Sequence, residues 1–300
     1  MRAFFCDTYE MPLPPGHRFP LPKYRLLRAR LLELGVLSAE ELEESALIDR
    51  ALLLLAHTPE YLEAVFSGAL REAEQRRLGF SWSEALLARS RASVFGTVAA
   101  ARAALEDGVA GNLAGGTHHA HADRGAGFCV FNDIAVAARA LQREGLIDRA
   151  LVVDLDVHQG DGTASIFAGD ASVFTFSMHG AKNFPFRKER SSLDVELADG
   201  CTDSEYIAEL TRHLPRALEQ ARPDIVFFQA GVDPLEDDTL GRLDVSLAGL
   251  RLRDRIVALA ARERGIPLVL TLGGGYARPI DLSVEAHVAT WRETRSVFGV

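Results

Sequence analysis

Cysteine is scarce in this chain of 300 residues. The three cysteines, Cys6, Cys129 and Cys201, lie far apart and form no CxxC pair, which argues against a disulfide scaffold and against a thiolate zinc site. Long apolar runs are also missing, since no segment approaches the roughly 20 residues of a membrane-spanning helix. The first residues lack the apolar core of a signal peptide. We therefore expect a soluble protein of a reducing, cytoplasmic compartment.

An excess of positive charge is likewise absent. The chain has 33 lysines and arginines against 42 aspartates and glutamates, and its formal net charge is -9. This balance disfavours general affinity for nucleic acid or for anionic membranes, so we expect neither as a partner. One basic run, residues 187–190, is interpreted as part of a solvated loop.

The chain does contain a succession of short apolar strands and amphipathic helices. Strands are predicted for "RAFFCDTY" and for four later segments, "ALVVDLDVHQG", "SVFTFSMHG", "DIVFFQAGVD" and "PLVLTLGGGY". Helices are predicted over roughly 83–107, 131–144, 203–220 and 246–264, after the last strand, and for "KYRLLRARLLELG", which closes on Gly35. In "SAEELEE", Ser38 and Glu41 form a capping-box pattern that predicts a further helix.

Continuous apolar strands that alternate with helices indicate an α/β fold, with a mainly parallel sheet covered by helices on both faces. No internal repeat, low-complexity tract or linker divides the chain, so we expect a single domain over residues 1–300. In such sheets the ligand site lies beyond the carboxyl ends of the strands.

Aspartate, histidine or tyrosine side chains follow several of the predicted strands. In "LVVDLDVHQGDGT", residues 151–163, three aspartates and a histidine interrupt an apolar run, and burying unpaired carboxylates is costly. The residues at these positions and in the glycine-bordered loop "GGTHHAHAD" are His118, His119, Asp154, Asp156, His158, Asp161, Asp233 and Tyr276. A lone Asp-x-His is more often a hydrogen-bonded pair in a loop, but its repetition with compatible chemistry at several strand ends predicts one site.

Two carboxylates and an imidazole suit Zn²⁺ or a similar divalent metal. Because side chains alternate along a strand, Asp154, Asp156 and His158 are expected to point to the same side. Asp154 and Asp161 are candidates for orienting histidines or for holding another cation.

Several motifs together resemble the metal-dependent histone deacetylase superfamily, which includes acetoin-utilisation proteins and acetylpolyamine amidohydrolases. They are "GGTHHAHADRGAGFCVFNDIAVAA", "VDLDVHQGDGT", "FTFSMHG", "QAGVDPLEDDTLGRL" and "LGGGY", in order over about residues 112–276. The short chain and the segment "GAGFCVFNDIAVAA" are most similar to bacterial members near class IV. The resemblance implies an arginase/deacetylase-type fold with a central parallel sheet.

The resemblance also implies roles for residues. Asp156, His158 and Asp233 match the ligands of a catalytic Zn²⁺, for which Fe²⁺ is an alternative. His118 and His119 match the tandem histidines, oriented by Asp154 and Asp161 respectively, with His119 as general base and acid, and Tyr276 matches the tyrosine that stabilises the oxyanion. Gly127, Phe128 and Leu240 match the wall of an acyl-lysine tunnel, and Asp154, Asp156, His158, Ser177 and Met178 match a structural K⁺ site.

The implied activity is removal of an acyl group, acetyl or longer, from the ε-amine of lysine or a related amine, by metal-activated water. The partner is then an acylated lysine peptide or protein, or a small acylated amine. Two features depart from the commoner pattern: Gln159 replaces a second histidine, and the loop "NFPFRKERSS" is not rich in glycine. Alternatives are a non-catalytic acyl-lysine or polyamine binding protein and an arginase-like ureohydrolase, although no metal ligand, tandem histidine or tyrosine is missing.

Overall fold

A single sheet of eight strands, in which all neighbours are parallel, runs through the computed structural model, and the structure describes residues 1–300. The strand order is β2-β1-β3-β8-β7-β4-β5-β6. The bounds are β1 Ala3–Phe5, β2 Leu42–Glu44, β3 Val109–Asn112, β4 Ala150–Asp154, β5 Val173–Gly180, β6 Leu193–Leu197, β7 Ile225–Gln229 and β8 Leu268–Thr271. The predicted parallel α/β fold is confirmed.

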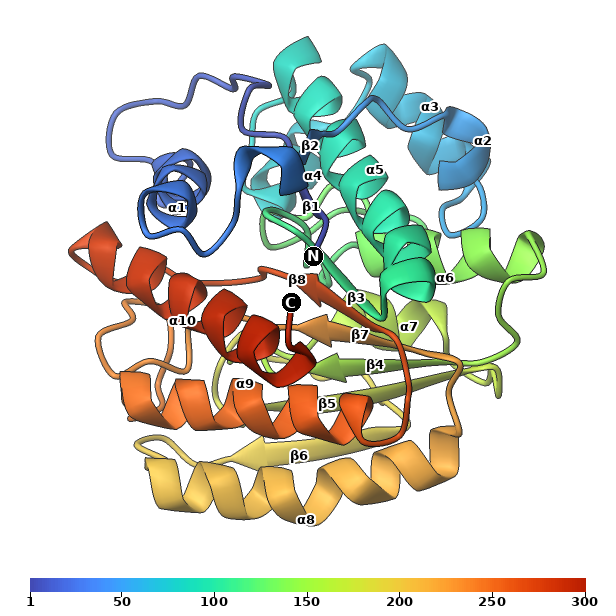
Figure 1. Cartoon of the computed structure of the whole chain (residues 1–300). Coiled ribbons are helices and arrows are strands. Elements are labelled where there is room, and N and C mark those ends of the chain that lie inside the picture. The colour runs from blue at the N-terminus through green and yellow to red at the C-terminus, as the bar shows by residue number, and fades with distance from the viewer.

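Helices cover both faces of this sheet, as Figure 1 shows with α8 and α9 on the near side and α6 and α7 behind. The bounds are α1 Pro22–Glu33, α2 Arg50–Leu53, α3 Pro59–Ser67, α4 Glu72–Leu78, α5 Glu84–Asp107, α6 Asp133–Arg143, α7 Asp161–Ile166, α8 Asp203–Ala221, α9 Leu247–Arg262 and α10 Ile280–Phe298. The long helices agree with the sequence-based expectation. None of the helices combines the length and the apolar character needed to cross a membrane.

The continuous apolar character of the strands follows from burial on both sides. In β7, Val226 and Phe228 belong to one hydrophobic core, whereas Ile225 and Phe227 belong to a second core on the other face. Successive side chains of a strand point to opposite faces, so a strand between two cores has no polar side. The polar site residues consequently lie at the last residues of the strands and in the loops that follow them.

The helix predicted for "SAEELEE" is wrong. Only one 3₁₀ turn forms, over Ala39–Glu41, and the chain then enters the edge strand β2. Glu41 does accept a hydrogen bond from the backbone N–H of Ser38, at 2.9 Å, but parallel pairing of β2 with β1 takes over after that turn. Tertiary pairing here overrides a local helix signal that is only one turn long.

A buried arginine joins the helical layer to the sheet. Arg253 of α9 is fully buried, its Nη1 donates to the carbonyls of Leu155 and Gly231, and its Nε donates to Asp254 at 2.8 Å. Thr290 of α10 donates to the other oxygen of Asp254, at 2.7 Å. Because Leu155 and Gly231 follow β4 and β7, this network fixes the backbone just beyond two adjacent strand ends.

We expect Asp254→Ala to lower the free energy of unfolding by about 3–5 kcal/mol, because the Arg253 guanidinium would remain buried without its counter-charge. The double variant Arg253→Met/Asp254→Leu should be more stable than Asp254→Ala, since it removes the unpaired charge. Urea denaturation of the three proteins measures this. A double variant less stable than Asp254→Ala would contradict the explanation.

Candidate active site

The loop after β4 carries the first two candidate metal ligands. β4 ends at Asp154, and the chain then turns, with the carboxylates of Asp154 and Asp156 accepting from the backbone N–H groups of Asp156 and His158 at 3.2 and 3.0 Å. These contacts are Asx turns, in which an aspartate bonds to the backbone two residues on. The three side chains gather in one region, since His118 reaches both Asp154 and Asp156 and His158 contacts Asp156, but loop geometry, and not the strand alternation from which we expected it, orients the latter two.

Asp156, His158 and Asp233 converge from the loops after β4 and β7. His158 Nδ1 lies 3.0 Å from an oxygen of Asp156 and 3.0 Å from an oxygen of Asp233. One ligand atom from each of the three buried side chains lies within 4.8 Å of the others. One imidazole nitrogen and two carboxylate oxygens form a donor set that fits Zn²⁺ with an open position, as in catalytic sites.

The protonation of this triad shows how strongly it requires a cation. Burial, together with the negative charge of Asp156, raises the pKa of Asp233 to about 7. Burial opposes charge on the His158 imidazole, but its hydrogen bonds to Asp156 and Asp233 raise its pKa to about 10. Both shifts have the same cause, two buried carboxylates that favour a positive charge between them.

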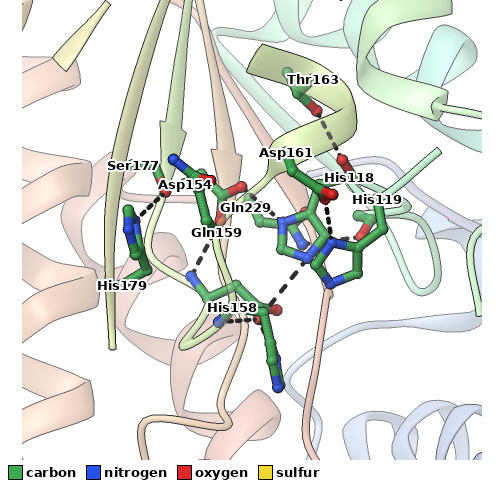
Figure 2. Close-up of polar contacts among 12 residues, drawn as sticks. His118, His119, Asp154, His158, Gln159, Asp161, Thr163, Ser177, His179 and Gln229 are labelled. Atoms are coloured by element: carbon green, nitrogen blue, oxygen red, sulfur yellow. Dashed lines mark hydrogen bonds and ion pairs between the residues drawn. The ribbon is translucent and has the colours of Figure 1, made fainter. Parts of the chain in front are cut away.

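The two adjacent histidines lie side by side, and each is hydrogen-bonded to its own carboxylate (Figure 2). His118 Nδ1 lies 2.7 Å from Asp154, and His119 Nδ1 lies 2.6 Å from Asp161, with 4.1 Å between the ring centroids. The pairs have the partners that the resemblance implies. Burial would lower the pKa of His118, but Asp154 and Asp156 raise it to about 9, whereas burial and the charge of His118 lower the pKa of His119 to about 4. His119 is therefore the neutral member near pH 7.

The side chain that shapes the histidine loop, Asp133, is not among the residues predicted from the sequence. Asp133, at the start of α6, accepts from the backbone N–H groups of Gly116 and Thr117 at 2.9 and 2.7 Å and from the hydroxyl of Thr97 at 2.6 Å. Asp133 directly follows Asn132, which caps α6, so the sequence could have identified a helix start here but not these distant partners of Asp133. His121, which was not assigned, adds a second contact to Asp161, at 3.2 Å.

The glycine triplet before Tyr276 allows the chain to pass directly over the triad. The backbone N–H of Gly274 donates to Asp156 at 2.7 Å, and a Cβ at Gly274 would collide with the carboxylate of Asp233. The backbone N–H of Tyr276 donates to Asp238 at 2.6 Å. Burial, with Tyr24 and Asp233 nearby, raises the pKa of the Tyr276 phenol well above its ordinary value, so it stays a proton donor.

A tunnel leads to the triad. Gly127, Phe128, Leu240 and Tyr276 line its mouth with Phe184, whose ring stands edge-on to His119 at 4.9 Å. Gly127 has φ +52°, and a side chain there would strike the His119 ring. Inside, a cavity contacts the triad and continues to the apolar side chains of Met11, Phe19 and Phe80.

Three of the residues expected at a K⁺ site lie on the neighbouring strands β4 and β5. Asp154 pairs with Ser177 across β4 and β5, and Met178 follows in the same strand. The hydroxyl of Ser177 lies 2.9 Å from Nδ1 of His179 (Figure 2). Asp154, Ser177 and Met178 therefore adjoin one another at the ends of β4 and β5.

Gln159 has a structural partner of its own. Its amide nitrogen donates to the carbonyl of Glu189 at 2.7 Å and to Asp194 at 2.8 Å, and its oxygen accepts from the N–H of Glu189 at 2.9 Å. Gln159, which stands where the family motif more often has a histidine, therefore attaches the loop of residues 181–192 to the loop that carries His158.

Comparison with known proteins decides the family. The model of the histone deacetylase domain matches residues 17–291. The chain belongs to this family. The histone deacetylase fold also accounts for the sheet: an HDAC homolog complexed with SAHA superposes with a TM-score of 0.84 at 26% identity, covering 99% of this chain and 84% of that one. An acetylpolyamine aminohydrolase from Burkholderia pseudomallei shares the fold, with a TM-score of 0.78 at 20% identity over 100% of this chain and 99% of its own.

Relatives by sequence agree with this assignment. Histone deacetylase 2 of Arabidopsis thaliana is 34% identical over 93% of this chain and 76% of its own length. An uncharacterized protein of Picosynechococcus sp. is 47% identical over 98% of both chains. This histone deacetylase family member is accordingly a deacetylase, a hydrolase that removes acetyl groups from amines. The ureohydrolase and non-catalytic alternatives are not supported.

We expect Zn²⁺ to stabilise the metal-free chain by about 2.7 kcal/mol at a free concentration 100 times its Kd. Each ion should displace one proton from His158, whose pKa is raised to about 10, and at pH 7 about half a proton more from Asp233, whose pKa is raised to about 7, because both groups must be deprotonated to become ligands. The apparent affinity should therefore rise with pH. Thermal unfolding with and without zinc, and calorimetry in two buffers of different ionisation enthalpy, measure the two effects.

Asp233→Asn should abolish most of the zinc-dependent rise in Tm, because it removes a charged ligand. Asp237→Asn is the matched control, since Asp237 is an exposed aspartate in the same loop. Equal zinc responses in the two variants would contradict the assignment of the triad.

Proposed function

We propose that the chain is a zinc-dependent deacylase that hydrolyses the amide between an acyl group, acetyl or longer, and the ε-amine of lysine or a related amine. The observation that carries this proposal is the meeting of three elements around one cavity: the triad of Asp156, His158 and Asp233, the neutral His119, and Tyr276. The substrate would be an acylated lysine peptide or protein, or a small acylated amine. Fe²⁺ could replace zinc on the same donors.

His119 is proposed to move the proton. Its Nδ1 is engaged with Asp161, so Nε2 is the atom available to accept a proton from the attacking water. The same nitrogen then delivers the proton to the departing amine. Positive charge that forms on His119 is stabilised by Asp161, while His118 with Asp154 acts as an electrostatic partner.

Tyr276 is proposed to donate a hydrogen bond to the oxygen that becomes negative when water adds to the carbonyl. Its raised pKa keeps the proton on the phenol at neutral pH, and Asp238 holds its backbone in place. A bound zinc ion would supply Lewis-acid polarisation of the carbonyl and lower the pKa of water. K⁺ held by Asp154, Ser177 and Met178 with the backbone of Asp156 and His158 would balance the remaining negative charge.

The proposed function is tested with zinc-loaded protein on lysine peptides that carry acetyl, butyryl, octanoyl or myristoyl groups, and on N-acetylputrescine. Hydrolysis of at least one compound is expected, and the acyl length with the highest kcat/KM defines the substrate class. The apolar side chains of Met11, Phe19 and Phe80, which line the inner cavity, would favour chains longer than acetyl. Stoichiometric zinc with no hydrolysis of any compound would contradict the deacylase proposal.

We expect Tyr276→Phe to lower kcat by about 10²–10³-fold, because it removes one donor to the oxyanion while leaving the ring in place. Zinc content, measured by mass spectrometry, should be unchanged. A loss of less than threefold in kcat would contradict the assigned role of the hydroxyl.

The pH profile tests His119. A general base must be neutral, and the lowered pKa, about 4, keeps this imidazole neutral to lower pH than an ordinary histidine. The rate constant kcat/KM should therefore stay level from pH 8 down to about 5 and fall only as pH drops through about 4. Zinc content is measured at each pH. A fall centred near 6.5 in protein that still holds zinc would be inconsistent with His119 as the base in this environment.

A further inference from the structure

The mouth of the tunnel is positively charged, although the chain as a whole has a net charge of -9. The lysines and arginines that line the two adjoining hollows at the mouth are Arg18, Arg77, Lys182, Arg242 and Arg278. No aspartate or glutamate lines either hollow. These five cations come from separate segments of the chain, so the fold brings them together at the mouth and they are not a single basic run.

Most of this charge has no counter-charge within the molecule. Lys182 and Arg242 share one carboxylate, that of Asp199, at 3.3 and 3.5 Å. Arg18, Arg77 and Arg278 are exposed and take part in no salt bridge or side-chain hydrogen bond, although Glu74 lies near enough to Arg77 for the arginine to lower the pKa of that carboxylate. With two carboxylates set against five cations, the mouth keeps a surplus of positive charge around the route to His119.

We propose that this mouth selects acyl-lysine residues that lie in acidic peptide segments, and that it discriminates against acetylated polyamines and lysine-rich segments. The inference rests on the proposed deacylase function and specifies the substrate. When an acyl-lysine side chain fills the tunnel, the neighbouring residues of its peptide must lie over the mouth. Flanking carboxylates would then face the arginines, whereas the second amine of an acylpolyamine would carry its positive charge into the same mouth.

The contribution is expected in capture of substrate more than in the chemical step. Charges at the rim of an interface change the association rate and its salt dependence, because they remain solvated and act before docking is complete. Their effect extends over about 8 Å at physiological salt. Phe186, which is 86% exposed and packs edge-on against Phe184, gives the flanking residues an apolar surface at the same mouth.

The test uses three peptides with one common acyl-lysine, flanked by aspartate and glutamate, by serine and glycine, or by lysine and arginine. At low salt we expect kcat/KM for the acidic peptide to exceed that for the basic peptide by about tenfold or more, mainly through KM. The difference should shrink towards equality at 0.5 M salt, about where the screening length falls to a few ångströms. Equal values at low salt would overturn the inference.

Charge reversal assigns the effect to the mouth. Arg18→Glu/Arg77→Glu should reduce the preference for the acidic peptide at least several-fold, and Arg216→Glu on α8 is the control, because Arg216 is exposed but lines neither hollow. Unchanged preference in the double variant, with Tm unchanged, would overturn the inference. Equal hydrolysis of all three peptides refutes only the selectivity, whereas no hydrolysis of any peptide by zinc-loaded protein refutes the proposed function itself.

Discussion

The structure depends on one electrostatic constraint, the burial of Asp156 and Asp233 side by side with His158 between them. Two carboxylates in a site of low polarity repel each other, and burial disfavours the charge on each. The pKa values of Asp233 and His158 are both raised, because a proton on either side chain reduces the repulsion between the two buried carboxylates. A divalent cation on these donors would reduce the same repulsion. The fold therefore buries two carboxylates at a cost in solvation free energy, and this burial forms the metal-binding site.

The parallel sheet supplies the geometry that this constraint requires. β4 and β7 are neighbours in register, with Asp154 opposite Gln229, so the loops that carry Asp156 and Asp233 leave the sheet side by side. Arg253 bonds to carbonyls in both loops, and Gln229 donates to the carbonyl of Gly116 beneath the histidine loop, at 2.9 Å. Backbone contacts thus restrain the two loops, and the acidic side chains are held together against their mutual repulsion.

Sequence patterns could predict the sheet and the residues at its strand ends, because both follow from local signals. Continuous apolar strands such as β7 report burial on two faces, and aspartates beside them stand out against that background. The contacts between distant segments could not be predicted in the same way. Asp133 holds the histidine loop and Asp238 holds both Tyr276 and Leu240, yet each is an ordinary polar residue in the sequence. The short strands β2, β3 and β6 are defined by their neighbours, which no local period reveals.

Electrostatics also distinguishes the interior of the site from its entrance. With zinc in place, the charges of Asp156 and Asp233 would be balanced, and protonated His118 balances Asp154. An amine released in the tunnel becomes a cation as it takes up its proton from His119, and Asp161 beside the neutral His119 is then the one unbalanced carboxylate near it. The five cations at the mouth repel a free ammonium group but attract carboxylates of a peptide that flank the lysine. A mouth of this kind favours the departure of the deacylated lysine only when the segment around it is not strongly acidic. Tight capture of acidic substrates would therefore carry a cost in slower product release, so that the flanking charge that gives the lowest KM need not give the highest kcat.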